Sequence, residues 1–181
     1  MKNTYRHGDL ANALVLDALV LLEEKSAEEL SLRDLAERAG VSPRAPYVHF
    51  PSKQHLLKAI AAKGFEDLTA RSIRAGFDIE ALGNAYVDFA IEKPHLFRLM
   101  FGGVYLTLEE CTDMDHSFTH VLAAIHHHHP EMSDDEVRLS GLGLWAFVHG
   151  LADLTIERLI TPVPLSALRN ILARVLADAR A

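Results

Sequence analysis

The chain has 181 residues, of which 49% are hydrophobic and 24% are charged, and its formal net charge is −7 at pH 7. This composition excludes a disordered chain, because the apolar residues are numerous enough to form a core. A single cysteine, Cys111, excludes an internal disulfide. The acidic total argues against non-specific coating of nucleic acid. No segment is expected to span a bilayer or to act as a secretion signal, so a soluble cytoplasmic protein is predicted.

Apolar residues recur with helical spacing along most of the chain, and the alternation typical of half-buried strands is almost absent. The predicted fold is therefore all-α, with about nine helices. In chain order they are expected at residues 10–22, 31–39, 42–50, 52–72, 78–92, 94–101, 108–129, 134–160 and 166–179.

Residues 31–57, SLRDLAERAGVSPRAPYVHFPSKQHLL, predict two short helices joined by a tight turn. Ser31 is a good N-cap for the first helix. Gly40 ends that helix, because glycine adopts the left-handed conformation without steric cost. Ser42 and Pro43 then suit the N-cap and first position of the second helix. This pattern is typical of a helix-turn-helix.

Charge is distributed unevenly around this segment. Residues 31–64 contain six lysines or arginines against two acidic residues, a net charge of +4 within a chain whose total is −7. A basic segment in an acidic protein indicates a local surface for nucleic acid.

The same segment resembles the DNA-binding region of the TetR/AcrR family of transcriptional regulators. The resemblance rests on the Leu-Ala-x-x-Ala-Gly-Val-Ser turn, on Tyr47-x-His49-Phe50 and on Ser52-Lys53-x-x-Leu56-Leu57. Further along, Trp145-Ala-Phe-Val-His149-Gly150 and the run EKPHLFRLMFG resemble the Trp-His-Gly class of C-terminal domain within that family.

The resemblance implies a domain organisation and a function. It implies a three-helix helix-turn-helix domain over residues 1–52 and a helical ligand-binding and dimerisation domain over residues 53–181. The expected protein is a homodimer through its two C-terminal helices. It is expected to repress transcription from a near-palindromic DNA operator and to be released by a small, mainly apolar effector. Neither an enzymatic activity nor a cofactor is implied.

DNA contacts are expected from the second helix of the motif and its surroundings. Contacts to phosphates are predicted for Ser42, Tyr47, His49 and Lys53, and base readout for Arg33, Pro43, Arg44 and Ala45. Phe50 is predicted to be a core residue. Val48 stands where many members of the family carry a basic or aromatic residue, so one polar contact is lost or becomes apolar. Pro46 disfavours helix at Ala45, and the helix is therefore expected to begin irregularly.

The residues that contact the effector are harder to identify from the sequence than those that contact DNA. The candidate residues are Phe89, Phe97, Met100, Phe101, Tyr105, His120, Trp145 and His149. They are candidates because domains of this class enclose a mainly apolar cavity. Apolar stripes of this kind are more often core, and a histidine beside a tryptophan is as well explained by packing, so both interpretations stay open.

The run His126–His129 supports an alternative function, a metal-dependent enzyme or a metal sensor. His126 and His129 would share one face of a helix at a spacing suited to a single ion. The competing interpretation is a polar helix end before Pro130, where histidine is favourable. The predicted site residues accordingly include no metal ligand.

Overall fold

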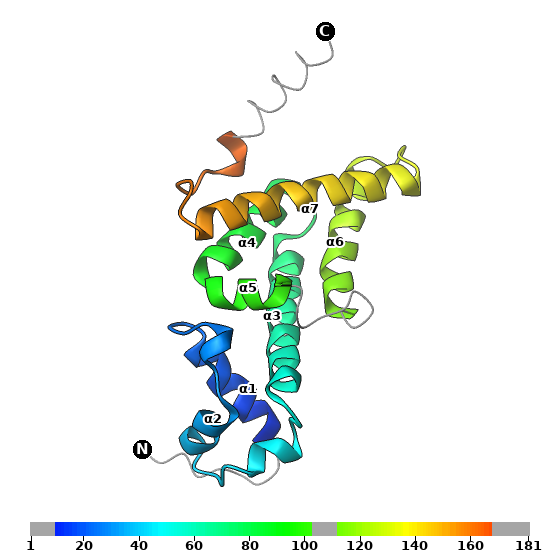
Figure 1. Ribbon diagram of the computed structural model, residues 1–181. Helices are drawn as coiled ribbons and strands as arrows, with labels where there is room; N and C mark the ends of the chain where they lie inside the picture. The colour runs from blue at the N-terminus through cyan, green and yellow to red at the C-terminus, as the bar shows by residue number, and fades with distance from the viewer. Residues whose placement is uncertain (1–9, 103–111, 168–181) are drawn as a thin grey trace. The chain divides into compact units, whose positions relative to one another are not determined.

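The computed structural model describes residues 10–102 and 112–167 (Figure 1). Within these ranges the chain forms seven α-helices and two short 3₁₀ helices and contains no strand, which confirms the all-α prediction. The elements are α1 (Leu10–Leu21), η1 (Ala27–Glu29), α2 (Leu32–Arg38), η2 (Ala45–Val48), α3 (Lys53–Ala75), α4 (Ile79–Glu92), α5 (Pro94–Phe101), α6 (Thr112–His128) and α7 (Asp134–Ile156). A further helical turn begins at Leu165, and the rest of the helix predicted for 166–179 lies outside the described residues.

The chain divides into two compact units. Unit 1 comprises Met1–Glu66 and Lys93–Thr112, and unit 2 comprises Asp67–Glu92 and Asp113–Ala181. The division falls inside α3, so a continuous helix and not a flexible linker runs from one unit into the other. The functional boundary predicted between residues 52 and 53 stays a prediction, because compactness alone does not locate a function.

Unit 1 is held together by apolar residues of α1, α2, α3 and α5. Leu14, Leu35 and Ile60 are completely buried at its centre. On the α5 side, the rings of Phe65 and Phe101 meet edge to face with centroids 5.4 Å apart. Such aromatic pairs stabilise packing beyond the area that they bury.

Unit 2 is built on the packing of α4 against α7. Its core contains Val87, Val148, Leu151 and Leu165. The second half of α3 is fastened to α4 through Arg71, whose guanidinium donates to Glu92 at 2.7 Å and lies 5.3 Å from the centre of the Phe89 ring. Unit 2 therefore has its own core, and the part of α3 that belongs to it is bound to α4.

The two ends of α7 are formed differently, the first by side-chain caps and the second by a left-handed residue. The start is a capping box, in which Ser133 accepts from the Glu136 N–H while the Glu136 carboxylate accepts from the Ser133 N–H at 2.8 Å. The end predicted near residue 160 is wrong, since the helix stops at Ile156. Arg158 adopts a left-handed backbone with φ 58, which ends the helix. This position precedes Pro162 and Pro164, so neither proline is needed to end α7.

The apolar character of α7 also corrects the expectation that no stretch is long and apolar enough for a bilayer. By length and composition alone α7 could cross one. A single helix of this kind is weak evidence for a membrane span, because a helix that packs in a protein core passes the same test. One face of α7 does pack against α4 within unit 2.

Candidate nucleic-acid interface

The predicted turn after α2 is present. Ser31 caps α2 by accepting a hydrogen bond from the Arg33 N–H at 3.2 Å. Gly40 has φ 68, and the Val41 N–H donates to the Ala36 carbonyl at 3.0 Å. This bond closes the helix end in the way that only a left-handed residue after the helix permits. The glycine turn of the helix-turn-helix is confirmed.

The second helix of the motif differs from the prediction. Instead of an α-helix over 42–50, the chain forms the four-residue 3₁₀ helix η2. Pro46 explains the difference, because it has no N–H to donate to Ser42 and disfavours α conformation at Ala45. The Ser42 carbonyl accepts from the Ala45 N–H at 2.9 Å instead.

The recognition turn, defined here as residues 42–50, exposes one set of side chains and buries another. Pro46 and Phe50 are buried and anchor the turn, as predicted for Phe50. Ala45 is half-buried. The exposed side chains are those of Ser42, Pro43, Arg44, Tyr47, Val48 and His49. The structure thus brings most of the predicted DNA contacts together on one short element of unit 1, and Arg33 is exposed at the start of α2.

Lys53 begins α3 next to this turn and already has a partner. Its Nζ donates to the backbone carbonyl of Glu28 at 2.5 Å, and the side chain is half-buried. An ammonium has three donors, so this bond leaves capacity for a phosphate oxygen. The neighbouring Ser52 hydroxyl is hydrogen-bonded to His55 Nδ1 at 2.9 Å.

The predicted effector residues are distributed over both units. Phe97, Met100 and Phe101 belong to unit 1, where Phe97 and Met100 are buried and Phe101 packs on Phe65. Phe89 is completely buried in unit 2. Tyr105 lies outside the described residues. In their own units the described phenylalanines and Met100 act as packing residues.

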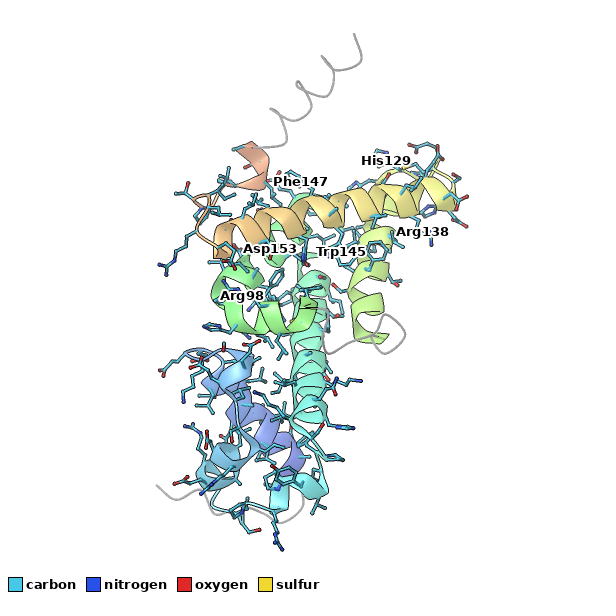
Figure 2. All side chains as sticks on the ribbon, in the orientation of Figure 1. Arg98, His129, Arg138, Trp145, Phe147 and Asp153 are labelled. Carbon is cyan, nitrogen blue, oxygen red and sulfur yellow. The ribbon has the colours of Figure 1, made fainter. Side chains whose placement is uncertain are left out.

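Trp145 and His149 meet a residue that the sequence did not indicate. Trp145 Nε1–H donates to the hydroxyl of Tyr86 at 3.2 Å, and the same hydroxyl is hydrogen-bonded to His149 Nδ1 at 2.7 Å. Figure 2 labels Trp145 on α7. Burial raises the pKa of the Tyr86 phenol above its ordinary value. No spacing rule connects Tyr86 to His149, because 63 residues separate them.

The histidines of α6 hold the segment that follows α3. His120 Nε2 donates to the Gly76 carbonyl at 3.0 Å, and His128 Nε2 donates to the Phe77 carbonyl at 2.8 Å. The ring of His127 lies 5.0 Å from that of Phe77. Over residues 10–102 and 112–167, no group of three or more metal-binding side chains comes together. Within the His126–His129 run, His127 and His128 both contact Phe77, and His129 is hydrogen-bonded to Glu131.

Two short helical elements around a glycine turn, with exposed Arg44, Tyr47 and His49 on a basic segment, define a helix-turn-helix DNA-binding protein. Residues 14–60 match the family described as bacterial regulatory proteins of the tetR family. Residues 79–179 match the tetracyclin repressor-like C-terminal domain. The chain belongs to the TetR family of bacterial transcriptional regulators.

Individual relatives agree with this assignment. The transcriptional repressor KstR of Mycolicibacterium smegmatis is 39% identical over 62 residues, which cover 34% of this chain and 30% of KstR. The match thus spans less than a third of that repressor. A protein of unknown function from Rhodococcus sp. RHA1 superposes with a TM-score of 0.78 at 29% identity, over 96% of both chains. A TetR-family regulator from Streptomyces coelicolor shares the fold at 23% identity, with a TM-score of 0.66 over 87% of this chain and 75% of its own.

Proposed function

We propose that this protein is a homodimeric repressor that binds a near-palindromic operator through the recognition turn and releases it when a small, mainly apolar effector binds. The observation that carries the proposal is the exposure of Arg44, Tyr47 and His49 on one short element of a basic segment. Phosphate contacts fall to Ser42, Tyr47, His49 and Lys53, and base readout to Arg33, Pro43, Arg44 and Ala45.

The outer face of α7 supports dimerisation. Its exposed residues at helical spacing are Leu139, Leu142, Gly143, Ala146, Phe147 and Leu154, with the half-buried Gly150 on the same line. Figure 2 shows Phe147 and Trp145 on opposite sides of α7. A Cβ added at Gly143 or Gly150 would meet nothing within 4 Å, so a second helix has room to approach closely. An apolar face of this extent is typical of a subunit interface.

Two-fold symmetry would repeat the recognition turn on the operator. The helix predicted at residues 166–179 would join α7 and their two copies in a four-helix bundle. The paired turns would then enter successive major grooves roughly 34–36 Å apart. Each half-site would be contacted by one subunit in the same way.

For effector release, the polar group Tyr86, Trp145 and His149 is the best-supported starting point in unit 2. A ligand there, or beside His120, would compete for hydrogen bonds that hold α4, α6 and α7 near the end of α3. Because α3 also carries Lys53 in unit 1, a shift of this helix would alter the DNA contacts. The effector needs to prefer the released state by about 1–3 kcal/mol.

The test is selection of binding sites from random duplex DNA, followed by binding measurements over a salt series. The native protein should prefer the selected site over random duplex and should bind more weakly as salt rises, because phosphate contacts release counterions. Arg44→Ala should cost about 1–3 kcal/mol on the selected site and relax its sequence preference. Arg74→Ala, which removes an exposed arginine at the end of α3 in unit 2, is the matched control and should bind as the native protein does. Equal binding to selected and random duplex would refute the proposal.

A further inference from the structure

Val48 is the most exposed large apolar side chain in the part of the chain that the structure describes, with 81% of its surface accessible. A single exposed valine ordinarily needs no explanation. This one, however, is the last residue of η2, in a turn where the side chains of Arg44, Tyr47 and His49 are also exposed. If the recognition turn faces DNA, Val48 is the most prominent apolar group on it.

The geometry of η2 pairs Val48 with Ala45. A 3₁₀ helix has three residues per turn, so residues three apart lie on one line along its surface. Ala45 and Val48 therefore form an apolar line beside the line of Arg44 and Tyr47, while Pro46 is turned into the core. Two chemically different rows are presented side by side.

The backbone around Val48 contributes little to readout. The N–H groups of Ala45, Tyr47 and His49 donate to carbonyls within the turn at 2.9, 3.2 and 3.0 Å. Readout by η2 therefore depends on side chains. The side chain of Val48 has neither a donor nor an acceptor, so it discriminates among bases only through apolar contact.

The major groove offers one apolar group on the base edges, the 5-methyl group of thymine. We propose that Val48, with Ala45 beside it, reads the 5-methyl group of a pyrimidine in each operator half-site. The inference rests on the proposed function, because it requires the recognition turn to enter the groove. Thymine and 5-methylcytosine present the same methyl group at the same place, so the chemistry is shared and the source is separated by experiment.

The experiment uses the full chain and operators selected from unmethylated random DNA. Each thymine of the operator is replaced in turn by deoxyuridine, which removes the methyl group and nothing else. One position in each half-site should be sensitive, and a single replacement there should weaken binding about fourfold, which corresponds to one buried methyl group. Val48→Ala should bind the thymine operator more weakly and should lose this sensitivity to uracil. Leu159→Ala, a matched truncation at a residue 71% exposed in unit 2, should keep it.

A second selection from DNA methylated at C5 of cytosine identifies the source of the methyl group. Enrichment of thymine in both pools assigns the contact to thymine, and enrichment of 5-methylcytosine at that position in the methylated pool assigns it to the modified base. Val48→Thr keeps the branched shape and one methyl group, so it should retain part of the uracil sensitivity and shows that the loss in Val48→Ala is local.

The inference is overturned if no uracil replacement weakens binding to an operator that the protein still prefers over random DNA. It is equally overturned if Val48→Ala stays as sensitive to uracil as the native chain. Both results leave operator binding intact, whereas failure of the proposed function would appear as the absence of any preferred site.

Discussion

Tyr86 shows how much a single side chain depends on its tertiary surroundings. Its hydroxyl accepts from Trp145 and is hydrogen-bonded to His149, and the residue is half-buried. Two polar groups on α7 thus share one oxygen from α4. For the Trp-His pair a ligand contact and a packing role were both left open, and the partner Tyr86 within the protein was not predicted.

Replacing this oxygen should be costly. Tyr86→Phe keeps the ring and removes the hydroxyl, so Trp145 Nε1–H and His149 Nδ1 lose their shared partner. The free energy of unfolding should fall by about 1–3 kcal/mol, as measured by urea denaturation. Tyr47→Phe, at a residue 52% exposed, is the control and should change it by about 0.5 kcal/mol or less. Equal effects of the two variants would contradict the role of the Tyr86 hydroxyl.

The raised pKa of Tyr86 implies that the stability of the protein depends on pH in the alkaline range. Burial raises the pKa of the Tyr86 phenol in the folded state. Its contribution to stability is therefore complete below the unfolded value of about 10 and declines as pH rises above it, because the unfolded chain ionises first. Denaturation between about pH 8 and pH 11 should show a steeper loss for the native protein than for Tyr86→Phe. Parallel curves for the two proteins would disprove the assignment.

At the scale of elements, α2 and α7 end with the same pattern of hydrogen bonds but with different residues. The left-handed position is Gly40 after α2 and Arg158 after α7. After α2 the Val41 N–H donates to the Ala36 carbonyl at 3.0 Å, and after α7 the Leu159 N–H donates to the Leu154 carbonyl, also at 3.0 Å. The first end was predictable from glycine. The second was not, because arginine carries no local signal for a left-handed backbone.

This comparison gives opposite expectations for the two positions. Arg158→Gly should stabilise the protein by about 1 kcal/mol, because it relieves the steric cost of a left-handed side-chain-bearing residue. Gly40→Ala should destabilise it by about the same amount, since a Cβ there meets no neighbour and only the backbone term remains. Thermal unfolding measures both. Arg158→Ala separates backbone from charge, and a gain as large as that of Arg158→Gly would contradict the explanation.

At the scale of the whole molecule, α7 has apolar residues on both faces. The inner face packs within unit 2 through Val148 and Leu151, and the outer face exposes Leu142 and Phe147. A second copy covering the outer face would remove this exposed surface from water, which is the physical basis of the proposed dimer.

Phe147→Glu places a charge in the centre of that surface and should favour the monomer, because an unpaired charge is costly to bury. Sedimentation equilibrium should show a lower association constant, and operator binding should weaken with it, since one subunit occupies one half-site. The control is Ile73→Glu, the same kind of change at a residue 61% exposed on α3. An unchanged dimer in Phe147→Glu would refute the proposed interface.

Features that depend on near neighbours in the chain were readable from the residues alone. They include most helix positions, the caps at Ser31 and Ser133, the turn at Gly40 and the basic segment, because capping, backbone conformation and helical periodicity act within a few residues. Even the irregular start of the recognition turn followed from Pro46, although its 3₁₀ form did not.

Contacts between distant segments were decided by the tertiary structure. The bond from Tyr86 to His149 and the carbonyl partners of His120 and His128 join residues far apart in sequence. Helical periodicity predicts which residues share one face of a helix, but it does not predict which other segment packs against that face. The physical reason is that packing partners are chosen by the folded chain as a whole, when distant apolar and polar groups leave water together.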